Sequence, residues 1–187
     1  MSACKLGLRL ILLNDSFGAR MLHSSAYHQL GKFIVRFQHL EGAVNEMLVL
    51  LADADDEVVR ILVNDLEYSR RLNTVDVLFA RFVDVRRGTD EAMKAEFHKL
   101  MVELSKLGSR RNELVHSMYF PWVNLDGKEG LLRRNSQLRA SKGQREEIEY
   151  EHQPEAFDAD LERLAAAANN LERFRLQVID WLYPDEP

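Results

Sequence analysis

The placement of proline limits what the first two thirds of this chain can fold into. The four prolines lie at positions 121, 154, 184 and 187, so none precedes position 121. Proline interrupts a helix because it lacks the backbone donor and its ring clashes with the preceding turn. Long helices are therefore permitted as far as position 120, and Pro121 and Pro154 predict boundaries between elements.

Apolar residues recur at steps of three and four in this proline-free part, as on the buried face of a helix. They predict a helix over 27–52, whose stripe consists of Leu30, Phe33, Ile34, Phe37, Leu40, Val44, Met47, Leu48 and Leu51. A second helical region covers 57–85 and carries two stripes, which fits either one kinked helix or two shorter helices. The acidic break at 53–56 suits a helix start.

Two further helices are expected, over 91–118 and 154–183, each with one apolar face. In the first of them, Arg111 stands where the helical phase requires a hydrophobic residue. Four or five amphipathic helices with short links predict a mainly α chain, folded as an antiparallel four- to five-helix bundle.

The segment 119–153 differs in character from the rest. Asp126-Gly127 is a strong turn signal, and the flanking residues are aromatic and aliphatic. A structureless loop of this length inside a compact domain is improbable. We therefore expect a small β-hairpin or three-stranded meander, inserted before the last helix.

Length and composition fit one intracellular domain. The chain has 187 residues and a formal net charge of −5, which argues against a protein that coats nucleic acid through its overall field. We expect an N-terminal arm over 1–26 and a single helical domain over 27–187. Cys4 is the only cysteine, which excludes an intrachain disulfide and fits the cytoplasm. The run Leu6–Leu13 is too short to span a bilayer, so no membrane association is expected.

The strongest candidate site lies in the stretch Arg111-Asn-Glu-Leu-Val-His116, at the end of the expected helix 91–118. Arg111 is a permanent cation whose planar donor fork suits phosphate. His116 can accept and return a proton near neutral pH. Asn112 lies four residues before His116 on the same helix face, where its amide would orient the imidazole or a ligand.

A purely structural interpretation of these residues is equally consistent with the pattern. Arg111 would then form an ion pair within the bundle, with Glu41 or Glu46 as partner. His116 would be a helix-end residue whose cationic form suits the negative end of the helix dipole.

The same stretch resembles the motif of the HEPN superfamily, in which an arginine is followed by a histidine after four to six residues, often with a polar residue next to the arginine. Phe37-Gln-His-Leu-Glu41 also resembles part of the first helix of bacterial HEPN-like proteins. The likeness covers about 27–183 in helix order, but only Arg111–His116 matches sharply.

This resemblance implies a helical bundle that dimerises with the motif at the interface. Many members are metal-independent endoribonucleases of toxin–antitoxin or phage-defence systems, and others are inactive binding modules. It implies that His116 assists attack of a ribose 2′-hydroxyl on the adjacent phosphate, that Arg111 stabilises the growing charge, and that Asn112 positions one or both. The family's further polar residue has two candidates, Asn45 and Glu46.

A basic stretch follows the motif. It lies between Gly130 and Arg145, contains no acid, and includes Arg133, Arg134, Arg139 and Lys142. With Arg110 these residues are the candidate RNA contacts, on a flap that would touch phosphates. The alternative is a solvated hairpin whose charges prevent edge-to-edge aggregation. Tyr119 and Trp122 would either stack on bases or close the core.

Other chemistries lack support. There is no His/Cys cluster with metal-ligand spacing, no glycine-rich phosphate loop and no dinucleotide motif, so neither metal nor cofactor is expected. Two hypotheses remain: a HEPN-like, metal-independent endoribonuclease with RNA and an antitoxin protein as partners, or a non-catalytic helical module for dimerisation, partner binding or nucleotide binding.

Overall fold

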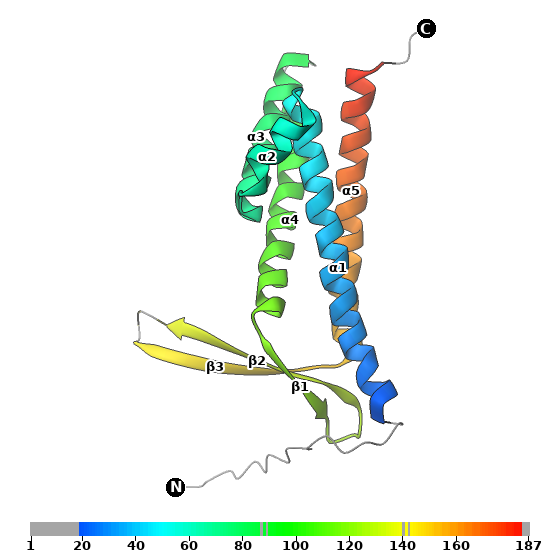
Figure 1. Ribbon diagram of the computed structural model, residues 1–187, viewed down its shortest axis with the longest axis vertical. Helices are drawn as coiled ribbons and strands as arrows, with labels where there is room; N and C mark the ends of the chain where they lie inside the picture. The colour runs from blue at the N-terminus through cyan, green and yellow to red at the C-terminus, as the bar shows by residue number, and fades with distance from the viewer. Residues whose placement is uncertain (1–18, 87, 89, 140, 142, 185–187) are drawn as a thin grey trace.

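A computed structural model describes residues 19–184, apart from positions 87, 89, 140 and 142. The described chain is mainly helical, with five α-helices and one three-stranded antiparallel sheet. The long helices lie along the molecule's long axis, and the sheet crosses one end of them (Figure 1). None of the helices in the described residues is both long and apolar enough to cross a membrane.

The first helix, α1, runs over Ala19–Ala52. It therefore begins inside the segment expected as an arm; residues 1–18 lie outside the described part. Most of the expected apolar stripe is buried, including Phe33, Phe37 and Val44, because these side chains share the face that packs against α3 and α5. Asp53 follows the helix with a φ of 49°, which ends it in the left-handed region.

The region 57–85 forms two helices rather than one kinked helix. They are α2 (Asp56–Asn64) and α3 (Tyr68–Arg86). The Asp55 carboxylate caps α2 by accepting from the Val58 N–H at 3.0 Å. In α3 the buried residues include Val75, Phe79 and Phe82, and the helix packs against α1 and α4.

The next helix, α4, runs over Glu91–Val115, and Asp90 caps it by accepting from the Met93 N–H at 3.0 Å. It ends before Met118, although the apolar stripe predicted a helix to that residue. Met118 instead opens strand β1 (Met118–Val123), where its side chain is 62% exposed. The aromatic and β-branched residues that follow favour a strand, which pairs with the next strand along the chain.

The segment 119–153 forms a three-stranded meander, one of the two expected arrangements. Strand β2 (Glu129–Arg139) lies between β1 and β3 (Gln144–His152). Leu131 pairs with Pro121 on one side and with His152 on the other. Gly127, with a φ of 77°, forms the β1–β2 turn at the predicted position.

The last helix follows Pro154 as expected. A short 3₁₀ helix, η2 (Pro154–Phe157), leads into α5 (Asp158–Leu182). Helix α5 packs against α1 and α4, and α3 packs against α1 and α4, so one apolar core lies among these four helices.

Candidate functional site

The C-terminal end of α4 carries the three candidate catalytic residues close to the surface. Asn112 and His116 are exposed, and Arg111 is half-buried. His116 closes the helix: its backbone N–H donates to the Asn112 carbonyl oxygen at 3.0 Å. The Asn112 side chain was expected to orient the imidazole or a ligand, or to position Arg111 and His116, and its Oδ1 accepts a hydrogen bond from Arg111. Arg111 and Asn112 are therefore joined through their side chains, whereas Asn112 and His116 are joined through the backbone hydrogen bond that ends α4.

The Arg111 guanidinium is held without a carboxylate. Its Nη1 donates to Asn112 Oδ1 at 2.9 Å, and its Cζ lies 5.8 Å from the centre of the Phe37 ring. In the part of the chain that the structure describes, no acidic side chain forms an ion pair with it. Glu46, one of the two expected acidic partners, accepts from Arg60 at 2.8 Å and 3.0 Å. Arg111 thus keeps donor capacity for a bound anion.

An aromatic pair lies beside Arg111, and a glycine makes room for it. A Cβ at Gly108, one helical turn before Arg111, would lie only 2.8 Å from Cδ1 and Cε1 of Tyr68. The Tyr68 ring therefore rests directly on the α4 backbone, and it meets the Phe37 ring edge-on at 5.2 Å. Burial, with a contribution from the negative charge of Glu41, raises the pKa of the Tyr68 phenol.

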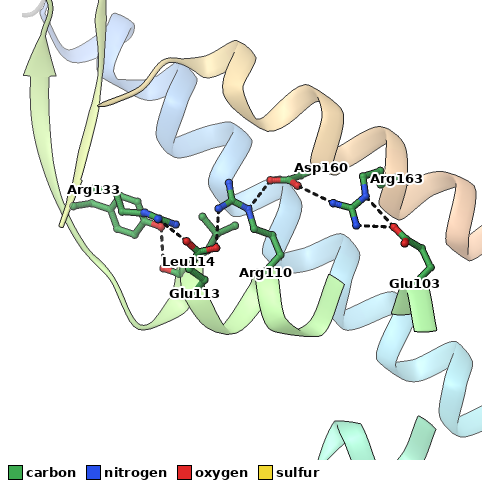
Figure 2. A network of polar contacts seen from close by, with 8 residues as sticks. Glu103, Arg110, Glu113, Leu114, Arg133, Asp160 and Arg163 are labelled. Carbon is green, nitrogen blue, oxygen red and sulfur yellow. Dashed lines mark hydrogen bonds and ion pairs between the residues drawn. The ribbon is translucent and has the colours of Figure 1, made fainter. Parts of the chain in front are cut away.

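The neighbouring Arg110 is engaged by acids (Figure 2). Its Nε donates to Asp160 Oδ2 on α5 at 2.7 Å, and its Nη1 donates to Glu113 Oε2 at 3.0 Å. Asp160 also lies 3.8 Å from Arg163, which binds Glu103 on α4. Arg110 was a candidate RNA contact, but these contacts make it a link between α4 and α5.

Arg133 reaches the same network from the sheet. Its side chain is 3% exposed, and its Nη2 donates to Glu113 Oε1 at 2.6 Å (Figure 2). Burial alone would raise the pKa of Glu113, but the hydrogen bonds from Arg133 and Arg110 outweigh it and lower that pKa. A buried arginine cannot meet an RNA phosphate in this arrangement. The role expected for Arg133 is therefore revised to that of a buried structural cation.

The Tyr119 side chain binds the backbone of the same turn of α4. The phenol donates to the Leu114 carbonyl oxygen at 2.9 Å, and burial raises the pKa of Tyr119 to about 12. Of the two roles considered for Tyr119, stacking on bases and closing the core, this hydrogen bond favours the structural one. The turn that carries His116 is therefore held on two sides. Tyr119 and Arg133 bind it from the sheet, and Arg110 ties it to α5.

A second histidine lies under the sheet. His152 is buried on the face of the sheet that also holds Arg133 and Tyr150. Burial and the positive charge of Arg133 lower the pKa of its imidazole, and Phe157 lies 5.6 Å away. His152 is therefore neutral at physiological pH and belongs to the junction between the sheet and the helices.

The arginines of this basic stretch that the structure describes are paired with acids. Arg134 Nη2 of β2 lies 2.6 Å from Glu149 of β3, and Arg145 lies 3.2 Å from Glu147 within β3. These pairs favour a solvated hairpin over a free cationic flap. The basic stretch also includes Arg139 and Lys142, whose side chains lie outside the described part of the structure.

The candidates for the family's further polar residue are both engaged elsewhere. Asn45 Oδ1 accepts from Arg71 at 3.3 Å, and Glu46 pairs with Arg60. Neither forms a hydrogen bond or ion pair with Arg111 or His116. Within the described residues, no three His, Cys, Asp or Glu side chains lie together as a metal ion would require.

The sequence predicted no role at this site for Glu113, Asp160 or His152. The one local signal was Glu113, which follows Arg110 by three residues, the spacing of an ion pair on a helix surface. Asp160 and His152 lie far away in sequence, and only the docking of α5 and β3 brings them close. Comparison of the chain with protein-family models, with curated proteins and with solved structures gives no match.

Proposed function

We propose that this chain is a HEPN-like helical protein that cleaves RNA without a metal ion, using Arg111, Asn112 and His116. The supporting features are the mainly helical fold, the placement of the motif at the end of a long helix, and the surface position of its polar residues. The fold we propose is the antiparallel bundle of that superfamily, built from α1, α3, α4 and α5.

One observation carries the proposal: two adjacent arginines have opposite environments. Arg110 is bound by two carboxylates, whereas among the described residues Arg111 has only the neutral amide of Asn112 as a hydrogen-bond partner. A structural arginine inside a bundle is normally neutralised by an acid. No acid of the described residues compensates the charge of Arg111 at this half-buried position, as a phosphate-binding group requires.

In the proposed reaction, His116 removes the proton from a ribose 2′-hydroxyl. The 2′-oxygen attacks the adjacent phosphorus, and the bond from phosphorus to the 5′-oxygen breaks as a proton is returned to that oxygen. Arg111 stabilises the negative charge that develops on the phosphoryl oxygens. Asn112 holds the guanidinium in place. The nucleophile belongs to the RNA itself, so the step needs no metal-bound water.

The proposed protein acts in the cytoplasm as a homodimer, with a toxin or phage-defence role and an antitoxin protein as regulator. A two-fold partner would supply a second Arg111 and His116 near the first. This matters because five residues separate the two side chains by about 140° around the helix, at ~100° per residue. A cavity shared by two copies would bring one chain's arginine to the other chain's histidine.

A non-catalytic nucleotide- or partner-binding module is the second candidate, and one observation favours it. Among the described residues no side chain forms a hydrogen bond or ion pair with the His116 imidazole, while the Asn112 amide binds Arg111. A general base is normally held by a third group that fixes its tautomer. The same site without that group would bind RNA or a nucleotide and leave it intact.

The test is RNA cleavage by the purified protein in the presence of EDTA, with the products examined for 2′,3′-cyclic phosphate ends. We expect cleavage by the wild type and a loss of at least about 100-fold in Arg111→Ala and His116→Ala. Matched controls are Arg36→Ala and His39→Ala, which replace exposed residues of the same types on α1.

Cleavage that survives both motif substitutions, or that requires added metal, would exclude the proposed mechanism. RNA binding without cleavage, lost in Arg111→Ala but not in Arg36→Ala, would establish the second candidate.

A further inference from the structure

Helix α2 exposes three apolar side chains on one face. Val58, Ile61 and Leu62 are 51%, 65% and 68% exposed. Their spacing of three and four residues places them together on the helix, away from the buried Val59 and Val63. Single exposed apolar residues are ordinary, but a contiguous group on one helix face marks an interaction site. We call these three residues the α2 outer stripe.

Helix α2, which carries the outer stripe, is anchored to the core through its opposite face. Val59 and Val63 pack into the core, and Arg60 binds Glu46 of α1 through two hydrogen bonds. The Asp55 cap fixes the first turn. The exposed face is therefore presented on an anchored helix, and its exposure does not come from a helix that has failed to dock.

A carboxylate stands at each end of the outer stripe. Asp55 lies one turn before Val58, and Asp65 lies seven residues after it, which is about −20° around the helix at ~100° per residue. The two positions are about 15 Å apart along the axis at ~1.5 Å per residue. Both side chains are exposed, and neither has an ion-pair partner among the described residues. Asp55 is explained by capping, but an acid at the C-terminal end of a helix opposes the helix dipole.

From this arrangement we infer that α2 is the docking site for a basic amphipathic helix of a partner protein. That helix would lie along α2, cover Val58, Ile61 and Leu62 with its own apolar side chains, and place a lysine or arginine near Asp55 and another near Asp65. Its two basic residues would be about ten positions apart, the spacing that spans ~15 Å on a helix. The inference does not depend on the proposed nuclease activity.

The charges also distinguish this partner from other occupants. In a two-fold pair of α2 helices, Asp55 of one copy would face Asp65 of the other, which places like charges together. Nucleic acid and the anionic face of a membrane would be repelled in the same way. A cationic helix is the occupant whose charges match both ends of the stripe.

The experiment uses the full chain and a synthetic helical peptide of about 18 residues, with leucines at steps of three and four and two lysines ten positions apart. Binding is measured by fluorescence anisotropy at low and high salt. We expect saturable binding that weakens with salt, and a loss of about tenfold for Leu62→Ser and for Asp65→Lys. A peptide with glutamates in place of its lysines should bind Asp65→Lys better than wild type.

Val77→Ser is the matched control, because Val77 is also 68% exposed but lies on α3, outside the outer stripe. Both Leu62 and Val77 are on the surface, so the two serine variants should fold like the wild type. Failure of the lysine peptide to bind, or equal binding by Leu62→Ser and Val77→Ser, would overturn the inference. So would a dimer that dissociates in Leu62→Ser, which would assign the stripe to a second copy of this chain.

Discussion

The middle of the helical core and its junction with the sheet are stabilised in different ways. In the middle, Phe79 stacks on Phe97 with ring centres 3.9 Å apart, and Phe174 meets both rings edge-on at 5.4 Å and 5.0 Å. At the junction, the buried side chains include Arg133, His152 and Asp160.

Because of this difference, the two regions have different roles in the fold. Apolar packing is non-directional, so the core mainly supplies stability. Buried charged groups need particular partners at particular distances, because an unpaired one is costly. The junction therefore fixes the position of the turn that carries Arg111 and His116, at the cost of tolerating little change.

The largest effect is expected in the middle of the core. Phe97→Ala would leave a cavity among three packed rings and lower the free energy of unfolding by about 3–5 kcal/mol. Urea denaturation measures this loss, with Val77→Ala as a surface control that should stay within about 0.5 kcal/mol. A loss below about 1 kcal/mol for Phe97→Ala would show that the aromatic cluster is not the main source of stability.

A smaller effect is expected at the junction. Glu113→Ala removes the acid that holds Arg133, whose side chain is 3% exposed against 37% for Glu113. We expect a loss of about 2 kcal/mol in the free energy of unfolding, because a buried cation loses its partner. Glu96→Ala breaks an exposed pair with Arg173 and should cost less than about 1 kcal/mol. Equal losses in the two variants would contradict the contrast between buried and exposed ion pairs.

The smallest effect is a dependence of stability on pH. The pKa of His152 is lowered in the folded protein from an ordinary value of 6.5, so the folded state binds fewer protons than the unfolded state. The contribution of His152 to the free energy of unfolding is complete above about pH 6.5. It is lost as the pH falls toward the lowered pKa of the folded state. Melting temperatures between about pH 7.5 and pH 5 should fall less steeply in His152→Gln than in the wild type. Parallel curves would show that His152 does not titrate within this range.

The sequence predicted the helices and strands better than it predicted the burial and the partners of the charged residues. The apolar stripes and the Asp126-Gly127 turn are strong local patterns, and they located the helices and the meander. The end of α4 was misplaced at Met118 because a methionine in helical phase also suits the start of a strand. Nothing local could show that Arg133 is buried, since that depends on the register that pairs it with Tyr150 and on the docking of the sheet against the helices.

The two arginines at the end of α4 show the same limit at the site. Arg110 and Arg111 are adjacent and chemically identical. Their local partners differ, Glu113 for Arg110 and Asn112 for Arg111, and the tertiary contact with Asp160 gives Arg110 its second carboxylate. The helical phase did single out Arg111 as unusual. The ring of Phe37 lies under its guanidinium, which explains how a cation can occupy that position.

The contact between Tyr68 and Gly108 also acts as a register lock between two helices. Gly108 is the only glycine of α4, so the ring fits against the backbone at one place along that helix. If α4 slid past α3 by one turn of ~5.4 Å, a side chain such as Leu104 or Asn112 would have to occupy the space of the ring. The axial position of the Arg111–His116 turn is thereby set to within less than one turn.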